Sequence, residues 1–136
     1  MTGAFNPYEK LVVLVVEDEP HTRGIIKGML RQIGVRSVLE AADGKAGLDE
    51  VMRGKPNLVL CDIHMEPVDG RMFLKLLRDA RLQQVRLTPV IFLTADAQRD
   101  TVMFAKEHHV NGYLVKPVAL GDLKARIDAI LKPEKA

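Results

Sequence analysis

Three carboxylates, one hydroxyl and one amine stand directly behind or at the end of short apolar runs of the sequence. In chain order they are Glu17, Asp18, Asp62, Thr94 and Lys116. Carboxylates held close together repel one another unless a cation lies between them, and their hard oxygens suit Mg²⁺. A carboxylate can also be the nucleophile that accepts a phosphoryl group, whose oxygens a lysine ammonium and a hydroxyl can bind. These residue types predict phosphoryl transfer to Asp62 at a magnesium site.

This chemistry requires the five side chains to meet, and the apolar pattern predicts where they do. The five short apolar runs are Leu11–Val16, Val35–Leu39, Leu58–Cys61, Pro89–Leu93 and Gly112–Val115. The first, third and fourth are continuously apolar, which is typical of strands buried on both faces of a parallel sheet. The carboxyl ends of such strands form the edge at which open α/β sheets bind ligands, so the polar residues should converge there.

Apolar residues at helical spacing follow each run and predict five helices. They are marked by Ile26 and Leu30, by Ala46 and Val51, by Phe73 and Leu77, by Val102 and Ala105, and by Leu123 and Ile127. Gly34 and Pro133 stand where the first and fifth helices should end. Strand and helix alternating five times predict an α/β fold, a (βα)₅ unit with a doubly wound, five-stranded parallel sheet and helices on both faces.

Length and composition predict one cytoplasmic domain. The 136 residues suit a single core, with residues 1–9 as a loose N-terminal extension, 10–132 as the domain and 133–136 as a tail. The longest strongly apolar run has six residues, far below the roughly 20 of a membrane helix, and the first residues do not predict a secretory signal. Cys61 is expected to be an inert core residue. A net charge of +2 does not by itself indicate nucleic-acid binding.

The motifs around the polar residues resemble, in order, those of a CheY-type receiver domain, the phosphoacceptor half of bacterial two-component signalling. The matching segments are Val15–Asp18, Leu60–Met65 with Val68–Gly70, Leu93–Ala95 and Gly112–Pro117. The resemblance implies a flavodoxin-like fold. Two features depart from the common pattern. The acidic pair is Glu17 and Asp18 rather than two aspartates, and Pro67 stands one position later than usual, after Glu66.

The resemblance implies a set of magnesium ligands. It makes Asp18 a direct ligand and Glu17 a ligand through water, with Asp62 and the backbone carbonyl of His64 as further ligands. The His64 ring is expected at the mouth of the site, where it affects the access of water.

The resemblance also implies how a phosphoryl group is held and sensed. Asp62 is the phosphorylated aspartate, and Thr94 and Lys116 bind the phosphoryl oxygens. Tyr113 is the switch aromatic that turns inward when Thr94 shifts. The phosphodonor is expected to be a sensor histidine kinase or a histidine phosphotransfer protein. A downstream protein is expected to bind through residues 98–132, and a homodimer is compatible with the sequence. Direct DNA binding and membrane association are not expected.

Two other functions remain open at this stage. An aspartyl-nucleophile phosphatase commonly carries a second acid two residues after its nucleophile, where this chain has His64, and it carries a cap insertion that is absent here. A receiver-like binding module that works without phosphorylation would not need the complete set of acidic, hydroxyl and amine groups. The basic residues Lys75, Arg78 and Arg81 recur at a spacing of three, which favours a solvated helix face over an anion-binding surface.

Overall fold

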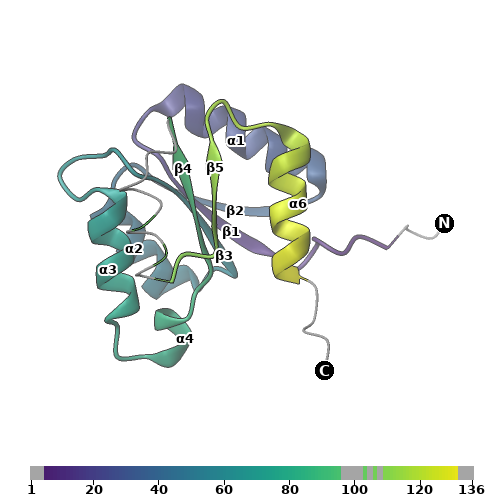
Figure 1. The fold of residues 1–136 in the computed structure, drawn as a ribbon. Helices are drawn as coiled ribbons and strands as arrows, with labels where there is room; N and C mark the ends of the chain where they lie inside the picture. Colours follow the sequence, from purple (N-terminus) through teal and green to yellow (C-terminus); the bar gives the residue numbers. More distant parts are fainter. Residues whose placement is uncertain (1–4, 96–102, 104–105, 107–108, 132–136) are drawn as a thin grey trace.

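The computed structural model describes residues 5–95, 103, 106 and 109–131, and it contains a five-stranded sheet with helices on both faces (Figure 1). The strands are β1 (Val12–Val16), β2 (Ser37–Ala41), β3 (Leu58–Asp62), β4 (Val90–Thr94) and β5 (Gly112–Val115). The helices are α1 (Pro20–Ile33), α2 (Gly44–Gly54), α3 (Gly70–Arg78), α4 (Gln83–Arg86) and α6 (Leu120–Leu131). The predicted α/β fold with a doubly wound parallel sheet is confirmed. The predicted helix around Val102 and Ala105 lies outside the described residues.

The strand order is β2-β1-β3-β4-β5, and each neighbouring pair is parallel. The chain therefore builds outward from β1 in both directions, and the topological switch point lies beside the carboxyl ends of β1 and β3. These ends are level with one another, because Val16 pairs with Cys61 and Asp62 pairs with Leu93. Residues that follow the strands consequently meet at one edge of the sheet.

Alternate strand residues pack into two core layers, one on each face of the sheet. Val13 and Val15 of β1 face the layer formed with α1 and α6, and Leu14 and Val16 face the layer formed with α2, α3 and α4. Every residue of β3 and β4 is buried. This double burial explains why these two strands are continuously apolar up to their last, polar residue. Cys61 lies in this core, as expected.

The second strand starts two residues later than the apolar pattern predicts. Val35 is buried, but its amide donates to the Leu30 carbonyl at 2.9 Å and so completes the turn that ends α1. Gly34 makes that turn with a φ of 125°, in the left-handed region that favours glycine. Val35 therefore contributes to the core without joining the sheet, and β2 begins at Ser37.

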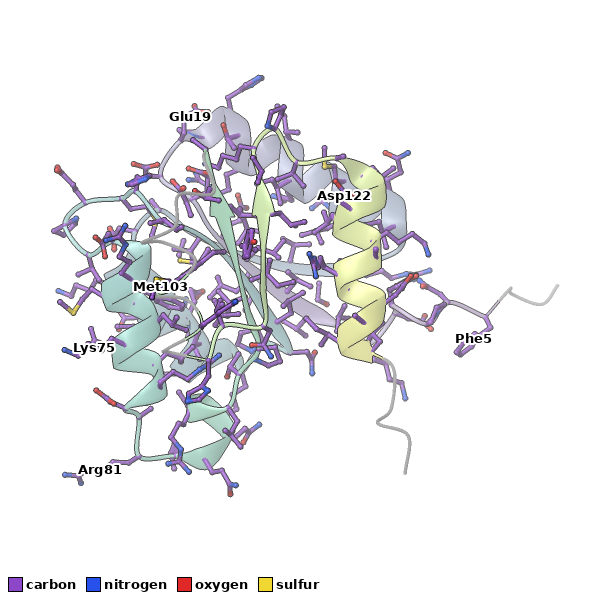
Figure 2. All side chains as sticks on the ribbon, viewed as in Figure 1. Phe5, Glu19, Lys75, Arg81, Met103 and Asp122 are labelled. Atoms are coloured by element: carbon purple, nitrogen blue, oxygen red, sulfur yellow. The ribbon has the colours of Figure 1, made fainter. Side chains whose placement is uncertain are left out.

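The segment before β1 makes long-range contacts at Asn6 and Tyr8, within residues 1–9 that the sequence predicts to be a loose extension. The Asn6 side-chain amide donates to the Gly34 carbonyl at 3.0 Å. Tyr8 is 7% exposed, and its hydroxyl donates to Asp128 of α6 at 2.7 Å. Phe5, by contrast, points away from the body of the molecule (Figure 2). Residues 6–9 therefore link the end of α1 to α6, through contacts distant in sequence that a local pattern does not reveal.

Arg78 is not the solvated residue that its spacing predicts. Its Nη1 donates to the carbonyls of Arg86 and Thr88 at 3.0 and 2.7 Å, and its Nη2 donates to the His109 carbonyl at 2.9 Å. These bonds hold together the chain around α4, a short helix that the sequence pattern did not predict. Lys75 and Arg81, in contrast, are exposed and point outward, as expected (Figure 2).

Candidate functional site

The polar residues predicted to converge do lie at the carboxyl edge of the sheet. Glu17 follows β1, Asp62 and Thr94 are the last residues of β3 and β4, and Lys116 follows β5. The Lys116 amide donates to the Thr94 carbonyl at 2.7 Å, which fixes the backbone of Lys116 beside β4. In Figure 2 this edge of the sheet is at the top of the molecule, where Glu19 of the loop after β1 is labelled, and Arg81 is labelled at the opposite end.

Lys116 links two buried carboxylates. Its Nζ lies 2.6 Å from Glu17 Oε1 and 3.2 Å from Asp62 Oδ1. The Glu17 side chain is 1% exposed and that of Asp62 is 7% exposed, whereas Lys116 is 24% exposed. Burial lowers the pKa of Lys116, but its hydrogen bond to Glu17 and the nearby negative charges outweigh burial and raise the pKa above its usual value. Lys116 therefore carries a positive charge in the folded protein at neutral pH.

Glu17, Asp18 and Asp62 form an acidic cluster in which one oxygen from each residue lies within 4.8 Å of the other two. Asp18 is exposed, and its pKa is raised by partial burial first and then by the neighbouring Glu17 carboxyl. With all three carboxylates ionised, Lys116 offsets one of the negative charges. Oxygen donors with one side open to water are the ligands that Mg²⁺ prefers, so the donor set fits this ion.

The loop that carries the acidic pair is held at successive residues. The Glu17 amide donates to the Ala41 carbonyl of β2 at 3.0 Å, and the Glu19 amide donates to Glu17 Oε2 at 3.2 Å. The Glu19 carboxylate then caps α1 by accepting from the amides of His21 and Thr22 at 2.9 and 2.7 Å. The hydrogen bonds from these two backbone amides lower the pKa of Glu19 to about 2. The start of α1 thus anchors the loop.

The loop after Asp62 depends on a glycine at the start of α3. The Gly70 amide donates to the Ile63 carbonyl at 2.9 Å. A Cβ on Gly70 would lie 2.4 Å from the Asp62 carbonyl oxygen, which is closer than real Cβ contacts. Asp69 caps α3 by accepting from the Met72 amide at 2.9 Å. Gly70 therefore allows the helix to approach the backbone of the candidate phosphoacceptor.

The His64 side chain lies at the mouth of the site. It is exposed and lines a surface hollow of about 460 Å³ together with Asp18, Met65, Glu66 and Asp69. The ring of His64 does not belong to the cluster of carboxylate oxygens, in keeping with the expected position of this side chain. The expected role of its backbone carbonyl stays a prediction.

Thr94 and Tyr113 lie on the same face of neighbouring strands. Thr94 is buried and pairs with Val115, while Tyr113 pairs with Phe92, two residues earlier on β4. Strand side chains alternate between faces, so Tyr113 is the diagonal neighbour of Thr94 on the α3 side of the sheet. Tyr113 is half-buried against that core layer. This adjacency is what a coupled movement of the two side chains requires.

Residues 13–128 match the response regulator receiver domain. The chain belongs to this family. Receiver domains are signalling modules of two-component systems. The chemotaxis protein CheY-3 of Vibrio cholerae is 32% identical over 124 residues, which cover 91% of this chain and 94% of that protein. CheY of Pseudomonas aeruginosa is 36% identical over 121 residues, which cover 88% of this chain and 95% of that protein.

Solved receiver structures share the fold of this receiver domain. CheY4 of Vibrio cholerae has a TM-score of 0.81 and 25% identity, covering 90% of this chain and 99% of its own. The receiver domain of a Pseudomonas aeruginosa sensor histidine kinase has a TM-score of 0.80 and 28% identity, covering 90% and 98%. The latter structure is described with a magnesium ion coordinated in its active-site cleft. These matches confirm the CheY-like fold expected from the motifs. Within the described ranges, no helix of this receiver domain is long and apolar enough to cross a membrane.

Proposed function

We propose that this receiver domain accepts a phosphoryl group on Asp62 and thereby switches a protein-binding surface. The proposed donor is a histidine kinase or a histidine phosphotransfer protein, and the proposed receiver unit spans residues 10–132. The observation that carries the proposal is the Lys116 ammonium, which contacts the carboxylates of both Glu17 and Asp62 at the carboxyl edge of the sheet. A lysine in this place can bind a phosphoryl oxygen as soon as Asp62 is modified.

The proposed step is a transfer to the Asp62 carboxylate. One carboxylate oxygen of Asp62 forms a bond to phosphorus, and the bond between phosphorus and the donor atom breaks, with its electron pair leaving on the donor. Glu17, Asp18, Asp62 and the His64 carbonyl would hold Mg²⁺, which supplies positive charge to the phosphoryl oxygens when bound. Lys116 binds a phosphoryl oxygen and opposes the added negative charge.

The proposed switch runs from the phosphoryl group through Thr94 to Tyr113. The Thr94 hydroxyl donates to a phosphoryl oxygen and moves toward Asp62. Tyr113, the diagonal neighbour of Thr94, then turns into the space behind it. Tyr113 already lines a hollow of about 410 Å³ with Val115, Asp122 and Arg126, so its movement changes the surface of β5 and α6. The proposed reader of residues 98–132 is another protein or a second copy of this chain.

The test is incubation with Mg²⁺ and a small acyl phosphate, followed by intact-mass measurement. We expect one phosphoryl group on the wild-type protein and none on Asp62→Asn. Asp49→Asn is the matched control, because it removes an exposed carboxylate of α2 and should leave the adduct unchanged. Rapid turnover of phosphate esters without an adduct would indicate a phosphatase, and no adduct at all would indicate a binding module. Either outcome would contradict the proposal.

The switch is tested separately by comparing backbone NMR shifts with and without beryllofluoride, a mimic of the phosphoryl group. We expect changes that extend along β5 and into α6, and that shrink in Thr94→Ala. Changes confined to the acidic pocket would show that phosphorylation is not transmitted to this surface.

A further inference from the structure

Arg23 of α1 connects the acidic loop to β2. Its Nη1 donates to the Glu17 carbonyl at 2.7 Å, and its Nε donates to Glu40 Oε1 at 3.2 Å. Lys27, one helical turn later, donates from Nζ to Glu40 Oε2 at 2.8 Å. The Arg23 side chain is only 20% exposed. Arg23, Lys27 and Glu40 lie outside the receiver-like motifs of the sequence.

The carbonyl that Arg23 binds belongs to the peptide unit between Glu17 and Asp18. The orientation of this unit sets the direction in which both side chains leave the backbone, because a peptide unit is planar and rotates as a whole. A charged donor at 2.7 Å holds such a carbonyl more strongly than a neutral donor does. Arg23 therefore acts on the geometry of the acidic pair without touching either carboxylate of the pair.

Glu40 makes this contact specific for arginine. A guanidinium is planar and donates in several fixed directions, so one side chain can bind Glu40 and the Glu17 carbonyl at the same time. The other carboxylate oxygen of Glu40, Oε2, forms an ion pair with Lys27. Because Val15 pairs with Glu40 across the sheet, the carboxylate that orients Arg23 is itself carried by a strand adjacent to β1.

We propose that Arg23 is a positioning residue for Glu17 and Asp18 and that it sets the affinity of the acidic cluster for Mg²⁺, with Glu40 holding its guanidinium in place. This inference rests on the proposed magnesium site. Partners that orient metal ligands typically change metal affinity by about 10- to 100-fold when removed. Since Arg23 acts through the backbone, we expect the low end of this range.

The test compares Arg23→Ala with Lys27→Ala, which removes the other cation bound to Glu40 and leaves the Glu17 carbonyl contact intact. In Arg23→Ala we expect about tenfold weaker Mg²⁺ binding in an NMR titration. We expect the Mg²⁺ concentration that half-saturates phosphorylation by an acyl phosphate to rise equally, with the rate at saturating Mg²⁺ unchanged. Lys27→Ala should stay within about twofold of wild type. Arg23→Lys should recover part of the affinity, because one ammonium can still reach the carbonyl.

A second readout needs no metal. The Asp18 amide belongs to the same peptide unit as the Glu17 carbonyl, so its NMR shift should change in metal-free Arg23→Ala and stay unchanged in metal-free Lys27→Ala. Glu40→Gln keeps Arg23 but weakens its support, so it should change the Mg²⁺ affinity and the metal-free Asp18 shift in the same direction as Arg23→Ala, and by less. This variant replaces Arg23→Ala in the test if Arg23→Ala does not fold. Wild-type Mg²⁺ affinity in Arg23→Ala at unchanged thermal stability would overturn the inference. Absence of Mg²⁺ binding by the wild-type protein would instead contradict the proposed magnesium site, while the metal-free Asp18 shift would still test the role of Arg23.

Discussion

Replacing Lys116 by methionine should destabilise the metal-free protein by about 2 kcal/mol. The substitution keeps an unbranched side chain and removes only the ammonium that contacts Glu17 and Asp62. Removing one partner of a fully buried ion pair costs about 3–5 kcal/mol, because the other charge is left without compensation. Lys116 is 24% exposed, and the cluster opens to water at Asp18, so we expect roughly half of that cost. Urea denaturation at pH 7 without divalent cations measures it.

The loss should depend on the second carboxylate. In a Glu17→Gln background only one of the two acidic partners of Lys116 remains, so Lys116→Met should cost about 1 kcal/mol less than in wild type. Mg²⁺ should reverse much of the loss, because a divalent cation replaces the missing positive charge and stabilises the folded state by mass action. Metal affinity should rise in Lys116→Met, since the ammonium and the metal compete for the same carboxylates.

The pH dependence gives a further check. The pKa of Lys116 is raised in the folded state, so its contribution is fully present below the ordinary value of 10.5 and is lost as the pH rises through the folded-state value. The difference in stability between wild type and Lys116→Met should therefore be constant from pH 7 to pH 9 and shrink above pH 10.5. If Lys116→Met is as stable as wild type at pH 7 and shows no coupling to Glu17→Gln, Lys116 is not paired with these carboxylates in solution.

Three further substitutions test the surroundings of the site. Glu19→Gln should lower stability above pH 4.5, because hydrogen bonds from backbone amides lower the folded-state pKa of Glu19. In denaturation experiments this loss of stability should vanish as the pH falls toward 2. Asp18→Asn should raise metal-free stability at pH 7, with the gain disappearing near pH 3.8, because partial burial raises the folded-state pKa of Asp18. Gly70→Ala should cost about 1–3 kcal/mol and shift the NMR signal of the Ile63 amide, since the added Cβ meets the Asp62 carbonyl of the same peptide unit. Gly24→Ala is its control, because nothing lies within 4 Å of a Cβ there, and helix propensity should make it neutral or stabilising.

The sequence predicted the sheet and the convergence of the acidic residues because both follow from short-range patterns. β3 and β4 are buried on both faces, so each appears as an unbroken apolar run that ends in a polar residue, Asp62 or Thr94. The parallel order then places strand ends at one edge without any knowledge of individual contacts. Glu17 and Lys116 are 99 positions apart, yet their proximity follows from this rule alone.

Features that rest on single long-range contacts could not be predicted in the same way. Tyr8 is an aromatic residue in a short polar segment, and its burial and its hydrogen bond to Asp128 rest on contacts with residues distant in the sequence. Arg78 occupies a position typical of a solvated helix face, but three carbonyl groups of later residues surround it. Arg23 is a further example, because its position in the first turn of α1 does not predict a hydrogen bond to the Glu17 carbonyl.

The glutamate at position 17 departs from the acidic pair expected for a receiver domain but keeps its negative charge. Its carboxylate is almost fully buried, with Oε1 bound by Lys116 and Oε2 bound by the Glu19 amide. Both oxygens are thus held by donors within the protein, whereas the carboxylate of Asp18 is exposed. This division supports the expectation that Asp18 contacts a metal directly and that Glu17 acts through water. The longer side chain lets Glu17 contact Lys116 while its negative charge stays next to Asp62, so the acidic pair retains its charge.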